Sequence, residues 1–493
     1  MSLWISLYLP TLSLDVCFPQ WPIDPRPAAV LQQDRVCACT PAAQAQGVRP
    51  GMRSSTLRGL VPGIELAADR PAARQQHLHD TALGLLQYTP NVAFFEAQSI
   101  VLEVSASLDL FKGPRTLLRR IRLTLQSMGV NARSGMAPTA LGAWILASQT
   151  SSAQRHCLGL HTLRRRLDLF PPQALPAARP YAAWLDGIGC RSLSQLRGLP
   201  RAGLQQRSSP LLVQELDAAY GASAYGFNWF QAPDVFSQRI DLIERLEHSH
   251  AVLAFSRRLI EQLCGWLQAR HRATQVLEFL LHHEKGRHAR PPTPMVLRLS
   301  EKAWLPEDFL SVLQEQVQAL SLGAAVIAIT LSVNTTTARP AASAGLFPEP
   351  AQWMRQEHRL LDLLRARLGG DRVLHAQPAA DYRPEHANLW GPMGAATAKP
   401  PLGLPPRLTL HSRPFWLLPR PVALATANNR PIHDNEPLRL VQGPERLESG
   451  WWNASGHDQR DYFIAQDRHG ARYWLYRQRE NQHSGWFLHG LFG

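Results

Sequence analysis

Apolar residues in the first 150 positions gather in short runs that alternate with stretches of helical spacing. Strand-like runs cover residues 3–9, 28–31, 91–105 and 131–137. The third run, NVAFFEAQSIVLEVS, predicts two short buried strands that meet at the turn Glu96-Ala97-Gln98-Ser99. The order of strands and helices predicts a mixed sheet that is covered by helices on one face, in a split βαβ arrangement.

Helices are predicted at residues 70–88, 113–128 and 138–148. The second of these is strongly amphipathic. Its apolar side chains lie on one face and its arginines on the other: Leu118, Ile121 and Leu125 against Arg115, Arg119 and Arg122. We therefore expect the arginine face of this helix to meet solvent.

Strand signals are absent from residues 161–220, where the spacing is helical. Residues 179–185 and 192–198 predict two helices joined by Asp186-Gly187-Ile188-Gly189, a helix-hairpin-helix. Ser192 and Gln195 form a capping box that fixes the start of the second helix. Backbone N–H groups in such a hairpin can hold a phosphate without contacting a base. An ordinary helical turn is the alternative interpretation.

After a linker at residues 226–237 the strand pattern returns. Four strands and two helices then form a complete βαββαβ unit: strands at 239–246, 274–281, 295–299 and 324–333, and helices at 251–270 and 307–320. This order of elements predicts a second α+β domain.

Beyond Val333 the composition shifts to Ala, Pro, Thr and Ser, as in a linker, with one helix predicted at residues 351–368. The C-terminal end is rich in aromatic residues, and the alternation in residues 472–477 predicts a strand of a small β-rich module. Aromatic side chains either fill such a core or lie at interfaces. The candidate partner-binding residues are Trp451, Trp452, Trp474, Trp486 and Phe487.

Length, charge and cysteine content indicate a multidomain protein that binds a polyanion and has no membrane helix. With 493 residues the chain is expected to form several domains, and no apolar run is long enough for a membrane helix. The net charge of +14 comes almost wholly from arginine and indicates a polyanionic partner, with nucleic acid favoured over a membrane. The scattered cysteines indicate a reducing cytoplasm. No metal site or cofactor is expected, and His282-His283-Glu284 is interpreted as a polar strand end.

Three short motifs resemble those of the Y-family of translesion DNA polymerases. They are Gly47-Val48-Arg49-Pro50-Gly51-Met52, Leu102-Glu103-Val104-Ser105 and Gly135-Met136-Ala137-Pro138. Their order and spacing cover about residues 1–335. The resemblance implies an α+β multidomain fold with a palm, fingers, thumb and little finger, followed here by a C-terminal extension.

The implied domain boundaries follow from the pattern of elements. The palm would comprise residues 1–10 and 69–160, and the fingers 11–68. The thumb with its helix-hairpin-helix would cover 161–229, a linker 230–237 and the little finger 238–336. A second linker at 337–410 would contain the helix 351–368, and residues 411–493 would form the aromatic-rich interaction module.

The positions that carry the family's chemistry differ in this chain. Ser6 stands for the first metal-binding Asp, and Gln98-Ser99 stand for the Asp-Glu pair. The Tyr and Arg with which the family contacts the incoming triphosphate correspond to Pro41 and Gln44 in this chain, and two of its lysines correspond to Ala140 and Trp144. Because two-metal phosphoryl transfer needs clustered carboxylates, these changes predict a pseudo-polymerase. The alternative is an active, divergent polymerase whose metals are held by Glu96, Glu103 or Asp109.

This combination resembles the catalytically inactive ImuB branch of the family, the scaffold subunit of a damage-induced mutasome. The resemblance implies three protein partners: the sliding β-clamp, a RecA-like accessory protein and an error-prone replicative-type polymerase. The candidate clamp contact is Leu346 and Phe347, in a segment similar to a clamp-binding peptide. The alternative for these two residues is that they hold the linker against the next helix.

Binding to primer–template DNA is expected to be sequence-independent and to involve phosphates. The candidate contacts are Gly187, Ile188, Gly189, Arg191 and Ser192 in the hairpin, and Arg287, Arg290 and Arg298 in the little finger. A third hypothesis is a protein-interaction module that no longer binds DNA.

Overall fold

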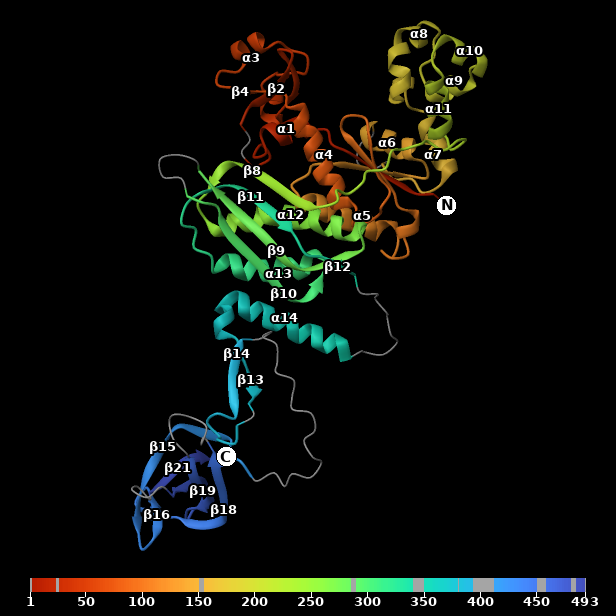
Figure 1. Ribbon diagram of the computed structural model, residues 1–493. Helices are drawn as coiled ribbons and strands as arrows, with labels where there is room; N and C mark the ends of the chain where they lie inside the picture. The colour runs from red at the N-terminus through yellow and green to blue at the C-terminus, as the bar shows by residue number, and fades with distance from the viewer. Residues whose placement is uncertain are drawn as a thin grey trace. The chain divides into compact units, whose positions relative to one another are not determined.

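The computed structural model of the chain describes residues 2–23, 26–149, 155–284, 290–339, 350–379, 381–392, 412–449, 458–479 and 485–492 (Figure 1). The chain forms two compact units, Met1–Arg367 and Leu368–Gly493. The first contains mixed α/β elements, and the second is mainly β-structure. Within the described residues, no helix has the length and apolar character needed to cross a membrane.

A four-stranded sheet lies at the centre of the first unit. Its strands are β1 (Trp4–Tyr8), β5 (Val92–Phe95), β6 (Ser99–Glu103) and β7 (Arg133–Ala137), in the order β5-β6-β1-β7. All three pairings are antiparallel. The four strands are those predicted, but the prediction of a mixed sheet was wrong. The helical connections make β5 parallel to β1 and β7 parallel to β6. Because β6 lies between β5 and β1, and β1 lies between β6 and β7, every hydrogen-bonded pair is antiparallel.

Helices cover both faces of this central sheet, so the prediction of a single covered face was also wrong. Side chains of α4 (Pro71–Leu85) and α5 (Pro114–Ser127) share one apolar core with one face. Helix α6 (Ala140–Gln149) packs on the other face. Gly135 in β7 permits this approach, because a Cβ atom there would lie 2.1 Å from the carbonyl oxygen of Ala143.

A small three-stranded sheet, in the order β3-β2-β4, follows β1 in the sequence. It consists of β2 (Ala28–Gln32), β3 (Arg35–Cys39) and β4 (Glu65–Ala68), accompanied by α1 (Leu12–Cys17), α2 (Pro41–Ala45) and α3 (Ser54–Leu60). Its own apolar core includes Val36, Val48 and Leu57. Strand β4, which pairs in parallel with β2, was not predicted because only its four residues are strand-like.

Residues 160–219 are helical, as predicted. The helices are α7 (Leu160–Leu167), α8 (Ala182–Gly187), α9 (Leu193–Gly198), α10 (Arg201–Arg207) and α11 (Pro210–Ala219), with a 3-10 turn at Pro176–Tyr181 before α8. Their leucines share an apolar core with α6 and with one face of the central sheet. The helical segment is therefore packed onto the sheet face that carries Ser6 and Ser99.

The predicted βαββαβ unit is confirmed. It comprises β8 (Phe236–Leu246), α12 (Ser249–Ala269), β9 (Arg272–His283), β10 (Thr293–Ala303), α13 (Pro306–Gln318) and β11 (Val326–Val333). The sheet order is β10-β9-β11-β8, and the short β12 (Thr337–Ala338) pairs with β9. Helix α14 (Pro350–Leu368), also predicted, ends the first unit.

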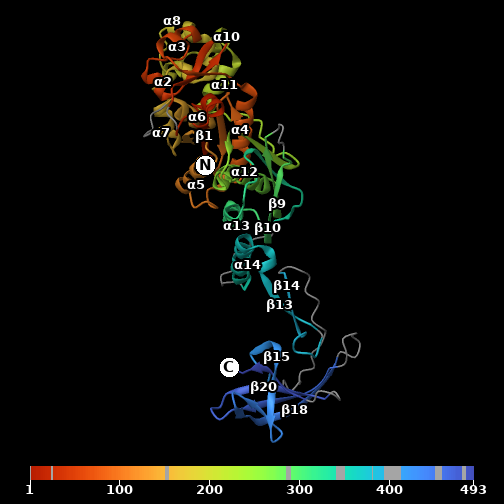
Figure 2. The same ribbon diagram turned by 90° about the vertical axis from the view of Figure 1, so that its left-hand side faces the viewer.

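Helices α12 and α4 lie side by side, as two views of the ribbon show (Figures 1 and 2). They cross so closely at Gly265 that a Cβ atom there would lie 1.8 Å from the carbonyl oxygen of Leu83. The apolar core of the central sheet is continuous with that of the βαββαβ unit. The two sheets of the first unit are therefore joined by a buried helix–helix contact.

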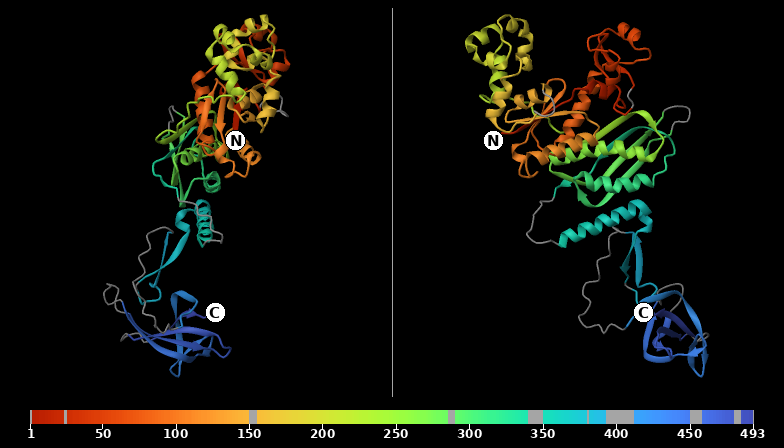
Figure 3. Two further views of the ribbon diagram at one scale, coloured as in Figure 1. Left: turned by 90° about the vertical axis from the view of Figure 1, so that its right-hand side faces the viewer. Right: turned by 180° about the vertical axis from the view of Figure 1, so that it is seen from behind.

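The second unit contains a hairpin and a seven-stranded, strongly curved antiparallel sheet (Figure 3). The hairpin strands are β13 (Leu374–Pro378) and β14 (Asn388–Pro392), within the segment expected to be a linker. The sheet consists of β15 (Trp416–Ala427), β16 (Arg430–His433), β17 (Glu436–Pro437), β18 (Arg439–Ser449), β19 (Asp458–Gln466), β20 (Arg472–Gln478) and β21 (Trp486–Leu491). Its order is β17-β16-β15-β21-β20-β19-β18.

Candidate functional site

Ser6 and Ser99 lie on the same face of the central sheet, at the positions that resemble metal-binding carboxylates. Ser6 pairs with Val101 on β6, and Ser99 pairs with Tyr8 on β1. Because paired residues share a face and side chains alternate along a strand, both hydroxyls point toward α6. Both side chains are fully buried. This face therefore presents two small hydroxyls where a two-metal site would need charge.

Trp144 of α6 fills the space over Ser99. Its indole Nε1 donates a hydrogen bond of 2.9 Å to Oγ of Ser99, and its side chain is 2% exposed. The Phe95 ring meets the indole edge to face, with centroids 5.1 Å apart. The Ser6 hydroxyl, in contrast, has no hydrogen-bond partner among the described residues. The packing is that of an aromatic core, with one satisfied hydroxyl and one unsatisfied hydroxyl.

Arg179 closes this aromatic cluster on its outer side. Its guanidinium lies 5.7 Å from the Trp144 ring centroid and forms a 2.8 Å ion pair with Glu96 in the β5–β6 turn. Nearby, buried Glu215 of α11 accepts a hydrogen bond from the backbone N–H of Ala177, and burial raises the pKa of its carboxyl group. The charged groups around Trp144 thus tie the helical segment to the sheet.

The carboxylates that a rebuilt metal site would use have other partners or lie apart. Glu96 is paired with Arg179. Glu103, at the far end of β6, accepts a 3.1 Å hydrogen bond from the backbone N–H of Ser105, as expected for a structural position. Asp109 lies exposed beyond the strand. No group of three or more His, Cys, Asp or Glu side chains that could hold a metal ion occurs in the described residues.

The positions that resemble triphosphate contacts are built into local structure. Pro41 occupies the first turn of α2, where a proline is favourable because that turn has free N–H groups. Gln44 donates from Nε2 to the carbonyl oxygen of Cys39 at 3.2 Å. Ala140 begins α6 and is buried. None of these three side chains carries a charge that could contact a triphosphate.

The helix-hairpin-helix is formed by α8 and α9 as predicted. Gly189 has φ +74°, a conformation that favours glycine. One half of the predicted capping box is present, because Oγ of Ser192 accepts from the N–H of Gln195. The Gln195 side chain accepts from the N–H of Arg191 at 2.7 Å, one residue before the N-cap, and not from that of Ser192. Gly187, Ile188 and Arg191 lie exposed. The hairpin is thus a well-specified, solvent-facing turn.

Several backbone donors of the hairpin are used inside it. The N–H groups of Ile188, Gly189 and Cys190 donate to the carbonyl oxygens of Trp184, Asp186 and Leu185, respectively. With the N–H of Arg191 held by Gln195, these amides are already satisfied. The exposed Arg191 side chain offers a further donor group beside these amides.

The candidate DNA contacts of the βαββαβ unit differ in their surroundings. Arg298 is exposed on the edge strand β10, pointing away from the helices because its neighbour Leu297 is buried. Arg290 donates to the carbonyl oxygen of Gly323 at 2.6 Å and so also holds a loop. Arg287 lies outside the described residues. His283 hydrogen bonds to Ala325 and Thr293, which supports its interpretation as a strand-end residue.

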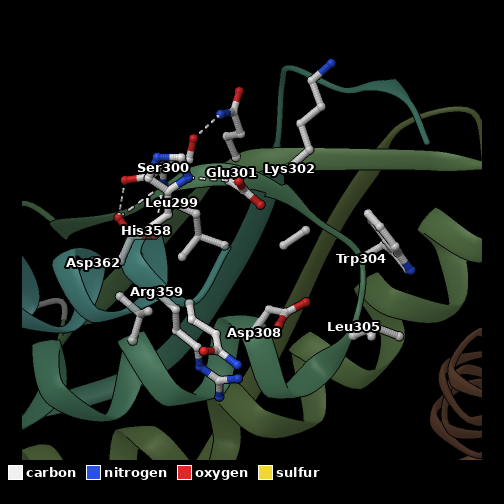
Figure 4. A pocket seen from close by; sticks show the side chains of 14 residues that line it. Leu299, Ser300, Glu301, Lys302, Trp304, Leu305, Asp308, His358, Arg359 and Asp362 are labelled. Carbon is white, nitrogen blue, oxygen red and sulfur yellow. Dashed lines mark hydrogen bonds and ion pairs between the residues drawn. The ribbon is translucent and has the colours of Figure 1, made fainter. Parts of the chain in front are cut away.

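A pocket of about 590 Å³ lies between β10, α13 and α14 (Figure 4). On one side, the Asp362 carboxylate of α14 accepts hydrogen bonds from the backbone N–H of Ser300 at 2.9 Å and from its hydroxyl at 2.6 Å. His358 bonds to Glu301 at 2.8 Å, while Trp304 lines the far side. Polar side chains of this pocket thus fasten α14 to the edge strand. The proposed clamp residues Leu346 and Phe347 lie outside the described residues.

The aromatic residues of the second unit mostly form its core. Trp474 and Trp486 are 2% and 6% exposed, so in this conformation neither is accessible to a partner. Phe487 is half-buried and stacks on Tyr476 at 5.1 Å. Trp451 and Trp452 lie outside the described residues. The large exposed aromatic side chains in the described part of this unit are Tyr382, Trp390, Phe415 and Trp416.

Comparisons with known proteins match these features. A family model described as the impB/mucB/samB family matches residues 22–148, from before β2 to α6. Two proteins named Protein ImuB, from Caulobacter vibrioides strains NA1000 / CB15N and ATCC 19089 / CIP 103742 / CB 15, are 26% identical over 473 residues. The alignments cover 91% of this chain and 100% of each relative. The chain is similar to ImuB-type proteins.

This similarity confirms the resemblance that the three motifs indicated and supports a Y-family-like, mixed α/β, multidomain protein. It reaches into the C-terminal unit, because the alignments cover 91% of this chain and the first unit ends at Arg367 of 493 residues. The family model includes Gln98, Ser99 and Trp144, so the cluster described above lies within the matched region.

Sequence reasoning identified Trp144 as a changed position but missed its contacts. It also missed a buried polar junction between α12 and α4. The Arg258 guanidinium lies 2.9 Å from Nδ1 of His77 and 4.0 Å from Asp80. Burial and the Arg258 charge lower the pKa of His77 to about 3, so the ring is neutral and can accept a hydrogen bond from Arg258. The only sequence signal was an arginine within the apolar spacing of a long helix.

Proposed function

We propose that this chain is a non-catalytic, Y-family-like scaffold subunit of a DNA-damage-induced translesion synthesis complex. In this proposal the central sheet is a palm, residues 11–68 are fingers, residues 161–229 a thumb and residues 238–336 a little finger. The chain binds primer–template DNA and recruits a sliding β-clamp, a RecA-like accessory protein and an error-prone replicative-type polymerase. The ImuB-type similarity over nearly the whole chain supports this assignment.

The observation that carries the proposal is the replacement of charge by aromatic packing at the palm face. Two-metal catalysis needs anionic ligands that hold two divalent cations about 4 Å apart. Ser6 and Ser99 supply no charge, and Trp144 occupies the space above Ser99. A metal ion there would have to displace an indole that is almost fully buried. In this proposal, polymerisation is the task of a partner.

DNA binding is proposed from charge and not from base contacts. The net charge of +14 favours a polyanion, and the exposed Arg191 and Arg298 offer guanidinium groups to phosphates. Such contacts are independent of sequence and weaken as salt is added. Exposed aromatic residues of the second unit, such as Trp390 and Trp416, offer the kind of surface that protein interfaces use.

Primer extension by the purified full-length chain tests the catalytic part. With Mg²⁺ or Mn²⁺ and all four nucleotides, no incorporation is expected. Incorporation that disappears in Glu103→Ala would show instead a polymerase with a rebuilt metal site. The same preparation should bind a fluorescent primer–template duplex in anisotropy titrations, with affinity that falls as salt rises. Absence of binding at both low and moderate salt would favour a pure protein-interaction module.

A pull-down with the clamp, the accessory protein and the polymerase tests the scaffold part. The full chain is compared with a chain truncated near residue 340, which removes Leu346, Phe347 and the whole second unit. Loss of partners on truncation is expected. Retention of every partner by the truncated chain would contradict the proposed division of labour.

A further inference from the structure

Positive charge is concentrated in one continuous part of the first unit. Residues 110–167 contain Lys112 and nine arginines, and no Asp or Glu. These ten cations account for most of the chain's net charge of +14 and leave only +4 for the remaining residues. Solvent-exposed surfaces usually mix charges of both signs. A stretch of this length without one carboxylate therefore indicates a surface with a specific anionic ligand.

The fold brings arginines from separate elements of this stretch together at the edge of the central sheet. Arg122 lies on α5 and donates to the hydroxyl of Ser134 in β7 at 3.0 Å. Arg133 begins β7, which is the edge strand next to β1. The carbonyl oxygen of Arg155 accepts from the N–H of Met136 at 2.9 Å, which holds the backbone of Arg155 beside β7. Helix α5, strand β7 and the segment at Arg155 thus lie next to one another at this edge of the sheet.

The positive charges at this edge of the sheet lower the pKa values of neighbouring basic groups. Burial, with the neighbouring charges of Arg133 and Arg122, lowers the pKa of Arg155. His156 next to it has a lowered pKa through burial and through the charges of Arg122, Arg155 and Arg166. Among the described residues, Arg122, Arg133 and Arg155 form no salt bridge with any carboxylate. Within the described residues, the repulsion among these arginines is therefore not offset by a salt bridge to a carboxylate.

We propose that Arg122, Arg133 and Arg155 form a phosphate-binding face at the edge of the central sheet, and that it binds a nucleic-acid backbone. The inference rests on the proposed DNA-binding function and adds a contact surface separate from the hairpin and the little-finger arginines. Arginine is suited to it because a guanidinium offers a planar fork of donors that matches phosphate oxygens. Binding there compensates the repulsion among the cations and releases counterions from the nucleic acid.

Nucleic acid is favoured over an acidic peptide because the positive charge runs along an extended part of the surface. Arg119 and Arg115 continue the exposed face of α5 toward its N-terminus, about one and two turns from Arg122, respectively. The array therefore extends along the helix axis, whereas an acidic peptide needs only a local cluster. A phosphate chain presents charges at regular intervals over such a length.

The test compares the full-length chain with the triple variant Arg122→Gln, Arg133→Gln and Arg155→Gln. A matched control removes the same charge at exposed arginines of other elements: Arg58→Gln, Arg257→Gln and Arg430→Gln. Fluorescence anisotropy is measured with a labelled duplex and with a labelled single strand, from 50 to 200 mM salt. For the duplex, the slope of log K against log[salt] should fall in magnitude by about 2 to 3 in the cluster variant, as expected for three lost contacts. Affinity at 100 mM salt should fall at least tenfold.

The control should retain its slope and stay within about threefold of the unmodified chain in affinity. Equal losses in the two triple variants would overturn the proposal, since net charge alone would then explain them. Unchanged DNA affinity in the cluster variant, with lost binding to poly-glutamate, would assign the surface to an acidic peptide instead. The two probes separate duplex from single-stranded binding. If the unmodified chain binds neither probe, the proposed function itself fails, a result distinct from failure of this surface alone.

Folding of the variants is monitored independently by thermal unfolding. Replacing three mutually repelling cations with neutral side chains should leave the melting temperature unchanged or raise it slightly. A lowered melting temperature in the cluster variant would indicate a structural role. In that case the variant Arg122→Lys, Arg133→Lys and Arg155→Lys, which keeps the charge, should restore the salt slope if the face binds phosphates.

Discussion

The indole Nε1 of Trp144 donates its hydrogen bond to a serine hydroxyl, that of Ser99, at 2.9 Å within a fully buried part of the central sheet. Ser6 lies on the same face and is equally buried, but its hydroxyl has no partner among the described residues. The two serines are thus equally buried but differ in whether the hydroxyl group has a hydrogen-bond partner. Comparing substitutions at the two serines therefore isolates the contribution of the Trp144 hydrogen bond to stability.

Ser99→Ala is expected to lower the free energy of unfolding of the first unit by about 1 to 3 kcal/mol, because it leaves the buried Trp144 N–H without an acceptor. Ser6→Ala is the matched control and should be neutral or stabilising, because it removes an unsatisfied buried hydroxyl. Chemical denaturation followed by fluorescence gives both values. Equal destabilisation by the two substitutions would contradict the role assigned to the indole hydrogen bond.

A second prediction concerns the crossing of α12 and α4. Gly265→Ala places a Cβ atom 1.8 Å from the backbone oxygen of Leu83, so the two helices must separate. We expect a loss of several kcal/mol in stability and faster proteolysis between the two sheets of the first unit. Gly203→Ala in α10 is the control, because no atom lies within 4 Å of its added Cβ. It should be neutral or slightly stabilising, since alanine is favoured over glycine in helices.

Much of the first unit was predictable because its strands and helices carry clear periodicities. Strands β1, β5, β6 and β7 and helix α5 occur where the pattern placed them. Strand direction was not predictable, since short buried strands have the same pattern in parallel and antiparallel sheets. The covering of both faces was missed because the apolar helix α6 lacks a polar stripe that would distinguish its exposed side.

Side-chain partners in the candidate site were less predictable than its location. The changed positions Ser99 and Trp144 lie 45 residues apart, and no local pattern indicates that they contact each other. The buried Trp474 was assigned to partner binding because aromatic content does not distinguish a core from an interface. The hairpin β13–β14 was missed because its strands contain only five residues each, within a segment of linker-like composition. Long-range packing decided each of these outcomes.

The second unit should lose stability in mild acid through His489. This side chain is 1% exposed, and its Nδ1 lies 2.8 Å from the Tyr462 hydroxyl. Burial lowers its pKa to about 4, with the Arg460 charge acting in the same direction and Glu385 opposing it. Below its ordinary pKa of 6.5, the unfolded chain binds a proton that the folded chain does not bind. Stability therefore falls as pH drops from about 6.5 to 4, by about 1.4 kcal/mol per pH unit at most.

Hydrogen exchange of β19–β21 peptides, corrected for the intrinsic pH dependence of exchange, measures this effect in the full chain. Protection should decrease between pH 7 and pH 5. His489→Gln should abolish most of this decrease, while His469→Gln, at an exposed position of the same unit, should leave it intact. The same pH dependence in all three proteins would assign it to other groups.

The last prediction concerns the attachment of α14 to the edge strand β10. Asp362 accepts from the N–H and the hydroxyl of Ser300, where the pairing of β10 with β9 is irregular and the strand edge would otherwise be open. Asp362→Ala leaves these donors unpaired, and we expect it to weaken the attachment by about 1 to 3 kcal/mol. Peptides from α14 should then exchange faster, while peptides from β11 remain protected. Asp371→Ala, at an exposed position just after α14, should change neither, and equal effects of the two substitutions would show that Asp362 does not hold the helix in place.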